Sequence, residues 1–247
     1  MWHDGGLHRV VAGSEVRIEP APGGVQIEPC DTAIAQEVAW LLGASFDLEQ
    51  FWDRATNEPP LAALREPLVG YRPPLVPDRW EMLVTSITAQ QVSLHSAFAV
   101  RSRLIERFGE RHEHAWAFPS RERIAQATES EVREVGFSTR KSEYVVDLAR
   151  GDLDFEALEQ LPDEGVIAAI TAQRGLGRWT ADWFLGRALG RPDAWPAGDL
   201  GVRKAVSFFY GAGRDLDEAE VREVGERFGR WRNVACHMLL AGARLHG

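Results

Sequence analysis

From Leu48 onward the chain shows helical periodicity with almost no strand signal, and this feature constrains its fold more than any other. Apolar residues recur at helical spacing, and prolines up to Pro77 and glycines beyond it separate the segments. Asp78 is placed to cap a long helix, because aspartate is a preferred N-cap. Further helices are predicted near residues 93–108, 121–127, 130–135, 140–149, 154–159, 163–172, 179–189, 200–210 and 217–228, with a last one from about residue 232.

The first fifty residues differ in composition from the rest. Residues 10–20 and 25–29 are rich in β-branched side chains and flank Pro22-Gly23-Gly24, which predicts two strands joined by a glycine turn. Asp31 and Thr32 are both placed to cap a helix over residues 33–42. The expected fold class is therefore mostly α with a small N-terminal β-sheet subdomain (α+β).

Composition excludes several classes of protein. The chain of 247 residues has no apolar run near the ~18 residues that a membrane span needs. Its N-terminus lacks the basic start and apolar core of a secretory signal. Two cysteines, Cys30 and Cys236, cannot form a disulfide framework or hold an iron–sulfur cluster. We therefore expect a cytoplasmic protein with no membrane association and no iron–sulfur cluster.

The charge of the chain limits how it could bind nucleic acid. The formal net charge of −9 argues against binding through bulk electrostatics. Only two of the 28 basic residues are lysines, Lys141 and Lys204. Any mechanism that proceeds through a Schiff base therefore has two candidate amines.

The densest motif lies in residues 166–205. Two helical patterns flank Arg174-Gly175-Leu176-Gly177, a turn so short that the helices must be antiparallel. We expect both glycines to allow positive φ and a close approach by a partner. The helix that follows exposes its N-terminal amides, which can bind a phosphate oxygen. A nucleic-acid backbone can thus be held without net positive charge.

These residues resemble the helix-hairpin-helix DNA glycosylases, specifically the 3-methyladenine DNA glycosylase II (alkylation-repair) branch. Four segments match in the family's order, and the resemblance runs over roughly residues 8–247. The segments are WEMLVTSITAQQVSLHSAFAVRSRLIERFG, GFSTRKSEYVVDLA, GLGRWTADWFL with the WPAGD that follows it, and RWRNVACHMLL.

The resemblance implies two helical lobes with a cleft between them. Residues 53–79 together with 192–247 would form the lobe that carries the catalytic aspartate, and residues 80–191 the lobe that carries the hairpin. Residues 1–52 would form a sheet-bearing subdomain with about half the strands of longer family members. An aromatic residue that some relatives contribute from this subdomain has no clear counterpart here, which implies a more open pocket.

The implied activity is that of a monofunctional DNA glycosylase of base-excision repair. Such an enzyme hydrolyses the N-glycosidic bond of alkylated purines, such as 3-methyladenine and 7-methylguanine, in duplex DNA by base flipping. Asp199 matches the family's catalytic carboxylate, which stabilises the oxocarbenium ion and orients water at C1′. The residue pattern alone favours an N-cap role for Asp199, and both roles can hold together. The expected partner is damaged double-stranded DNA, bound in the nucleoid by a monomer.

The resemblance also places tryptophans in the base-binding pocket. Trp179 and Trp183 stand four residues apart and share a helix face, and Trp231 is a third candidate. Indole faces attract a cationic alkylated purine. The alternative is that these residues are helix-packing aromatics. Bifunctional relatives carry a Schiff-base lysine where this chain has Trp179, so no lyase activity is expected.

The remaining predicted site residues come from the wedge and the hairpin. Gln90 and Gln91 match the family's wedge, which fills the gap left by the flipped base, and Gln91 is favoured. Two polar residues at a helix end are the alternative interpretation. No cofactor is required, although the resemblance implies a monovalent cation. The predicted DNA-backbone contacts are Gly175, Leu176, Gly177, Arg178 and Thr180, and the predicted cation ligands are the backbone carbonyls of Thr171, Gln173 and Gly175.

Two alternatives stay open. The same chemistry could act on hypoxanthine, ethenoadenine or oxidised guanine. The chain could also be a helix-hairpin-helix module that binds DNA structure without catalysis, in which Asp199 is only a helix cap. The combination of Asp199 with Trp179 and Trp183 favours the enzyme, because a pure binder has no need of it.

Overall fold

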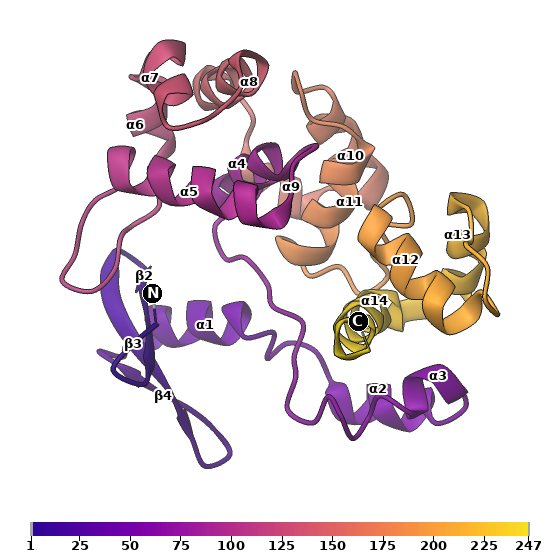
Figure 1. The fold of residues 1–247 in the computed structure, drawn as a ribbon. Coiled ribbons are helices and arrows are strands. Elements are labelled where there is room, and N and C mark those ends of the chain that lie inside the picture. The colour runs from indigo at the N-terminus through magenta and orange to yellow at the C-terminus, as the bar shows by residue number, and fades with distance from the viewer. Residues whose placement is uncertain (1, 247) are drawn as a thin grey trace.

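The computed structural model describes residues 2–246, and in Figure 1 a small sheet at the N-terminus lies beside a larger helical body. The strands are β1 (Trp2–His3), β2 (Gly6–Val11), β3 (Ser14–Ala21) and β4 (Gly24–Glu28). The helices are α1 (Thr32–Leu41), α2 (Leu48–Ala55), α3 (Pro59–Ala62), α4 (Arg79–Ala89), α5 (Leu94–Phe108), α6 (Arg121–Ala125), α7 (Glu129–Glu134), α8 (Thr139–Arg150), α9 (Phe155–Gln160), α10 (Asp163–Thr171), α11 (Arg178–Arg187), α12 (Leu200–Tyr210), α13 (Glu218–Glu226) and α14 (Arg232–Leu245), with the short 3-10 helix η1 (Gly229–Trp231) before α14. The predicted fold class is confirmed.

The N-terminal sheet has more strands than the two that the sequence predicts. Its order is β1-β2-β3-β4, and every neighbouring pair is antiparallel. The glycine turn at Pro22-Gly23-Gly24 is confirmed, since it joins β3 to β4. The predicted strand over residues 10–20 is wrong, because Ala12 and Gly13 have φ of 48° and 77° and form a second tight turn within it.

The sheet packs against α1 through a small core of its own. Val16 and Ile18 of β3 are buried together with Ile34 and Val38 of α1. The helix begins as predicted, with the Asp31 carboxylate accepting a hydrogen bond from the Ile34 amide at 2.8 Å. The alternation of buried and partly buried residues in β3 therefore determines which face of the sheet receives α1.

Two larger cores organise the helices. One gathers buried residues from α4 to α11, with Leu83, Leu104 and Phe184 among the most deeply buried. The other joins α2 and α3 to α12–α14, which lie beside one another in Figure 1. Trp183 on α11 packs against both cores. The helical part of the chain thus contains two separate cores. The exact boundaries of the two predicted lobes remain a proposal.

Most predicted helices are found within a few residues of their expected bounds, because polar N-caps mark their starts. The side chains of Asp78, Ser93, Thr128 and Ser138 each accept a hydrogen bond from a backbone amide of the following helix.

No helix among residues 2–246 combines the length and hydropathy needed to cross a membrane.

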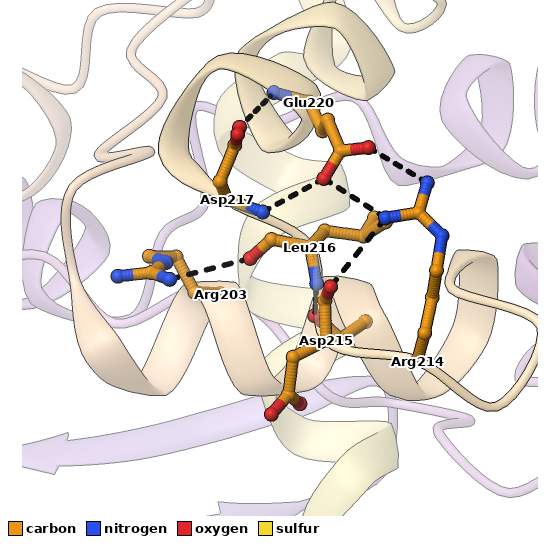
Figure 2. Close-up of polar contacts among 7 residues, drawn as sticks. Arg203, Arg214, Asp215, Leu216, Asp217 and Glu220 are labelled. Atoms are coloured by element: carbon orange, nitrogen blue, oxygen red, sulfur yellow. Dashed lines mark hydrogen bonds and ion pairs between the residues drawn. The ribbon is translucent and has the colours of Figure 1, made fainter.

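A polar network holds the connection between α12 and α13 (Figure 2). The Arg214 guanidinium donates to both carboxylate oxygens of Glu220, at 3.0 and 2.7 Å. This contact and the Asp217 amide lower the pKa of Glu220 to about 2. Ser207 of α12 accepts a hydrogen bond from the Leu216 amide at 2.8 Å. The network therefore anchors α12 from its C-terminal end, opposite the end that carries Asp199.

Candidate active site

The start of α11 and the start of α12 meet at the carboxylate of Asp199. The indole Nε1 of Trp179 donates a hydrogen bond to Asp199 Oδ2 at 2.6 Å, and that of Trp183 donates to the same oxygen at 3.2 Å. The two tryptophans reach one atom because residues four apart lie on one helix face. The structure thus brings together three of the predicted site residues.

Asp199 is also the N-cap of α12, since its Oδ1 accepts a hydrogen bond from the Val202 amide at 2.9 Å. Both interpretations of this residue are therefore compatible with the geometry. Each oxygen of a carboxylate can accept about two hydrogen bonds. The two indoles occupy Oδ2, so among residues 2–246 the half-buried carboxylate keeps one free acceptor position, on Oδ1. Three donors hold the group in a single orientation.

A glycine lies next to this carboxylate. A Cβ added to Gly201 would lie 3.0 Å from Asp199 Oδ1, so a larger residue there would crowd the free acceptor position. The same Cβ would contact Leu240 of α14. Burial, with the charge of Asp199, raises the pKa of the Cys236 thiol, which is therefore neutral and a poor nucleophile. Gly201 was not singled out from the sequence, because its importance depends on the side chain of Asp199.

The two tryptophans differ in their surroundings. The Arg187 guanidinium lies over the Trp183 ring at 5.8 Å from its centroid, and the His237 ring meets it edge to face at 5.8 Å. Burial lowers the pKa of His237 to about 4, so this partner is uncharged at neutral pH. Trp183 is therefore also a packing residue. Trp179 is half-buried, and its ring has no aromatic or cation–π contact within residues 2–246.

Trp231 lies in different surroundings from the other two. It ends η1, where its ring is 6.2 Å from that of Phe51 and has the Arg230 guanidinium over it at 4.7 Å. It packs against the core that contains α2 and α14. Neither Asp199 nor the other two tryptophans are among these contacts, so the structure does not join Trp231 to the Asp199 cluster.

The hairpin between α10 and α11 needs its two glycines for different reasons. Gly175 has φ of +83°, and a Cβ there would overlap the ring of Tyr144. The expected positive φ is wrong for Gly177, which has φ of −125° as the N-cap of α11. An N-cap residue adopts extended backbone angles. Gly177 provides no side-chain cap, so the amides of the first turn of α11 keep their hydrogen-bonding capacity.

The side chains of the other predicted hairpin residues differ in exposure. Leu176 and Thr180 are 5% and 1% exposed, so their side chains are inside the protein. Arg178 is exposed and forms an ion pair with Asp182 at 2.7 Å. Burial raises the pKa of Asp182, and Arg178 opposes this shift. Among residues 2–246, Arg178 therefore pairs with one carboxylate and is otherwise exposed to solvent.

Arg174 was not predicted as a site residue, yet it fastens the hairpin to α8. Its guanidinium forms ion pairs with Glu143 at 2.5 Å and Asp147 at 2.9 Å, and it lies over the Tyr144 ring at 5.4 Å. The only sequence signal was an arginine in the turn facing acidic residues at helical spacing on a distant segment. Such a signal has no meaning until the two segments are known to be adjacent.

The two predicted wedge residues lie in the turn between α4 and α5 and have different environments. The Gln90 side-chain amide donates to the Gly175 carbonyl at 2.8 Å. Gln91 is exposed and has φ of +53°, an uncommon conformation for a residue other than glycine. Gln90 is therefore tied to the hairpin, and Gln91 is the residue free to project.

The predicted cation ligands are consistent with the structure and remain a prediction. The Gly175 carbonyl accepts from Gln90, and the Gln173 carbonyl accepts from the Leu176 amide at 3.1 Å. Each carbonyl oxygen retains a second lone pair, as does that of Thr171. Within residues 2–246, no group of three or more His, Cys, Asp or Glu side chains is arranged to hold a metal ion.

Comparison with known proteins links this geometry to DNA repair. Residues 84–230 match a family described as HhH-GPD superfamily base excision DNA repair protein. The chain is also 29% identical over 201 residues to the DNA-3-methyladenine glycosylase of Bacillus subtilis (strain 168). That alignment covers 78% of this chain and 66% of the relative, so the chain spans just under two thirds of the relative's length.

Solved structures share the fold over nearly the whole chain. The 3-methyladenine DNA glycosylase from Archaeoglobus fulgidus superposes with a TM-score of 0.89 at 29% identity, covering 98% of this chain and 88% of that one. An 8-oxoguanine glycosylase/lyase from Clostridium acetobutylicum, solved with DNA, gives a TM-score of 0.85 at 20% identity and covers 99% and 87%. At that identity the second likeness concerns the fold alone.

The family match begins in α4 and ends in η1, which is more than half of the chain. It includes the wedge turn, the hairpin, both tryptophans that contact Asp199, and Asp199 itself. The chain therefore belongs to the HhH-GPD superfamily of base excision DNA repair proteins.

Proposed function

We propose that this protein is a DNA glycosylase that removes alkylated purines, such as 3-methyladenine and 7-methylguanine, from duplex DNA in base-excision repair. The observation that carries the proposal is the Asp199 carboxylate, held by two indole N–H groups on Oδ2 with a free acceptor position on Oδ1. The relatives named as 3-methyladenine DNA glycosylases support the choice of substrate.

In the proposed reaction the damaged nucleotide is flipped out of the duplex and its C1′ lies beside Asp199. As the N-glycosidic bond breaks, the base leaves with the bonding electrons and the sugar becomes an oxocarbenium ion. An alkylated purine that already carries positive charge leaves as a neutral base. A water molecule then attacks C1′ and loses its proton, which Oδ1 can accept because that oxygen has an unused lone pair.

The fixed orientation of the carboxylate is what makes it effective. A preorganised charge beside developing opposite charge stabilises the transition state by roughly 3–4 kcal/mol, judged from single oxyanion-hole groups. Trp179 and Trp183 supply this preorganisation through their N–H groups. The half-buried ring of Trp179 can in addition stack on a cationic base, because its faces have no ring partner within the described residues.

The test of this function is base release from methylated duplex DNA, with free 3-methyladenine and 7-methylguanine separated and quantified. We expect both bases to be released and alkali-labile abasic sites to remain. DNA carrying hypoxanthine, ethenoadenine or oxidised guanine forms the second arm. Release of a base from the second arm alone would support the glycosylase reaction and show that its substrate is another lesion. Binding without release from any of these DNAs would contradict a glycosylase.

We also propose that the enzyme has no lyase activity. Trp179, which donates the shorter of the two indole hydrogen bonds to Asp199, occupies the position where the resemblance expects a lysine in bifunctional relatives. Lys141 donates its Nζ to the carbonyls of Thr88 and Gln90, at 3.1 and 2.6 Å. The other lysine, Lys204, is exposed on α12. Neither lysine has a hydrogen bond or ion pair with Asp199 within residues 2–246.

Borohydride reduction during turnover is therefore expected to trap no covalent enzyme–DNA adduct. Borohydride reduces a Schiff base to a stable amine, so an adduct would report an attacking lysine. The 8-oxoguanine glycosylase/lyase of Clostridium acetobutylicum serves as the positive control, on its own lesion. An adduct that forms with the wild type and disappears in Lys141→Met or Lys204→Met would overturn the monofunctional assignment.

The hairpin is proposed to bind a phosphate of the DNA backbone, which makes Gly177→Ala informative. We expect this variant to lose about tenfold in DNA affinity, or ~1.4 kcal/mol, because the new methyl group shields the first-turn amides of α11. Damaged and undamaged DNA should be affected alike, since a phosphate contact has no base specificity.

The fold should tolerate Gly177→Ala, because a Cβ at that position meets nothing within 4 Å. Gly24→Ala in the β3–β4 turn is the matched control, since it also has open space and lies in the N-terminal sheet. Fluorescence anisotropy with labelled duplexes measures the affinities. Equal affinities of Gly177→Ala and wild type would remove the hairpin from the interface.

The partner is damaged double-stranded DNA bound by a monomer, with the carbonyls of Thr171, Gln173 and Gly175 available for a monovalent cation next to the phosphate. Binding through helix amides is compatible with the net charge of −9, because the attraction is local to the first turn of α11.

A further inference from the structure

The turn that carries Gln91 is held by two elements that are distant from it in the sequence. Lys141, on α8, donates its Nζ to the carbonyl oxygens of Thr88 at 3.1 Å and Gln90 at 2.6 Å. The Gln90 side chain in turn donates to the Gly175 carbonyl of the hairpin at 2.8 Å. The wedge turn, α8 and the hairpin are therefore joined by three hydrogen bonds.

Lys141 acts on the part of the turn that most needs a donor. The last carbonyls of a helix have no partner within the helix and carry the negative end of its dipole. Thr88 and Gln90 lie at the C-terminal end of α4, and the ammonium group of Lys141 binds both carbonyls at once. Burial lowers the pKa of Lys141, in keeping with a side chain withdrawn from solvent. Its role in the protein is therefore structural attachment rather than surface charge.

Gln91 depends on this attachment. Its φ of +53° is unfavourable for a residue with a side chain, and such a conformation persists only where the surroundings impose it. Gln91 is exposed, and the apolar residues that follow it, Val92 in the turn and Leu94 at the start of α5, are 46% and 61% exposed. Gln91 thus projects from a turn whose backbone is held in place by the hydrogen bonds of Lys141 and Gln90.

We infer that Lys141 and Gln90 are positioning residues that hold the Gln91 wedge at a fixed place relative to the hairpin. The inference rests on the proposed function, in which the hairpin binds the DNA backbone and Gln91 fills the gap left by the flipped base. With the wedge turn bonded to Gly175, phosphate binding and wedge insertion occur in one geometry. Lys141 acts through the backbone of the wedge turn, which its Nζ contacts, rather than on the reacting atoms.

If Lys141 positions the wedge, the effect of losing Lys141 on the rate of base release should depend on the free energy needed to flip the damaged base. Flipping costs unstacking and unpairing free energy, and the cost is least for a base that has lost its partner. A positioning residue for the wedge should therefore matter for a paired lesion and little for an unpaired one. A residue that merely supports the fold should affect both substrates alike.

The experiment compares Lys141→Met with wild type under single-turnover conditions, with enzyme in saturating excess. One substrate carries 7-methylguanine opposite cytosine, and the other carries the same lesion opposite an abasic-site analogue. We expect release from the paired substrate to slow about tenfold and release from the unpaired one to change less than twofold. Gln90→Leu should show the same pattern, and Lys141→Arg should restore the paired rate because arginine can also donate to two carbonyls.

Lys204→Met is the matched control, since it removes the same charge from an exposed lysine on α12 and should leave both rates unchanged. Thermal unfolding of each variant tests whether the compared proteins are folded. If Lys141→Met is not folded, the rates of Gln90→Leu on the paired and unpaired substrates test the positioning role instead. Equal slowing on the two substrates, or no slowing on either, would overturn the positioning role.

A second readout separates this inference from the proposed function. A duplex with 2-aminopurine next to an abasic-site analogue becomes more fluorescent when a wedge unstacks the neighbouring base, with no bond broken. At saturating protein, we expect wild type and Lys141→Arg to raise the 2-aminopurine fluorescence and Lys141→Met to leave it unchanged. If wild type releases no base and still shows this contrast, the glycosylase assignment falls and the positioning role stands. A signal from Lys141→Met equal to that of wild type would reject the role whatever the activity.

Discussion

Asp199→Asn is expected to lower the rate of base release by at least about 10²-fold while leaving DNA affinity close to that of wild type. The carboxylate interacts with positive charge that exists only in the transition state, so its loss affects the chemical step rather than binding. Single-turnover release from methylated duplex DNA measures the first quantity, and anisotropy with the same duplex measures the second.

This substitution separates the two roles that the structure gives to Asp199. Asparagine is as good an N-cap as aspartate, so the side-chain amide oxygen of the variant can still accept from the Val202 amide and α12 should keep its cap. The amide nitrogen of the variant then takes the place of Oδ2 and cannot accept from the two indoles, so the indole contacts are lost together with the charge. Asp199→Ala would also remove the cap and cost about 1 kcal/mol of folding free energy. Asp154→Asn, at the N-cap of α9, is the matched control for the change of charge at a helix start.

Near-full activity of Asp199→Asn would mean that Asp199 is only a helix cap. The chain would then be closer to a module that recognises DNA structure, or its catalytic group would lie elsewhere. The indole contacts argue against this, since an N-cap needs one acceptor oxygen and Asp199 has both oxygens engaged by defined donors.

Gly175→Ala is expected to destabilise the protein by roughly 2–4 kcal/mol. The φ of +83° at Gly175 is unfavourable for alanine, and the new methyl group would overlap the Tyr144 ring. Tyr144 cannot move aside freely, because the Arg174 guanidinium lies over its ring and is itself paired with Glu143 and Asp147. Urea unfolding followed by tryptophan fluorescence measures the loss.

Gly177→Ala provides the contrast two residues away. Its φ of −125° suits any residue and its Cβ position is open, so its stability should lie within about 0.5 kcal/mol of wild type. A pair of glycines that look alike in the sequence would then separate into one needed for folding and one needed for DNA binding. If both variants unfolded at the wild-type urea concentration, Tyr144 would not pack against Gly175 in solution.

Much of the fold could be predicted from the sequence because its signals are local. Helix starts such as those at Asp78, Ser93 and Ser138 depend on a side chain and an amide two or three residues away. The error in the N-terminal sheet has the same origin. The turn consists of Ala12 and Gly13, both with positive φ, and only one of them is a glycine, so the surrounding β-branched residues hid it within an apparently continuous strand.

In the candidate site, too, the features that depend on local spacing could be predicted and the contacts between distant residues could not. The hairpin, the N-cap role of Asp199 and the shared face of Trp179 and Trp183 follow from spacing along the chain, so the sequence by itself determined them. Only the tertiary structure decided that both indoles bind one oxygen of Asp199, that Gln90 is tied to the hairpin while Gln91 projects, and that Trp231 packs against Phe51. These contacts join residues on different elements, and Gln90 and Gly175 are 85 positions apart. Whether such groups meet depends on how the helices pack, which local spacing does not encode.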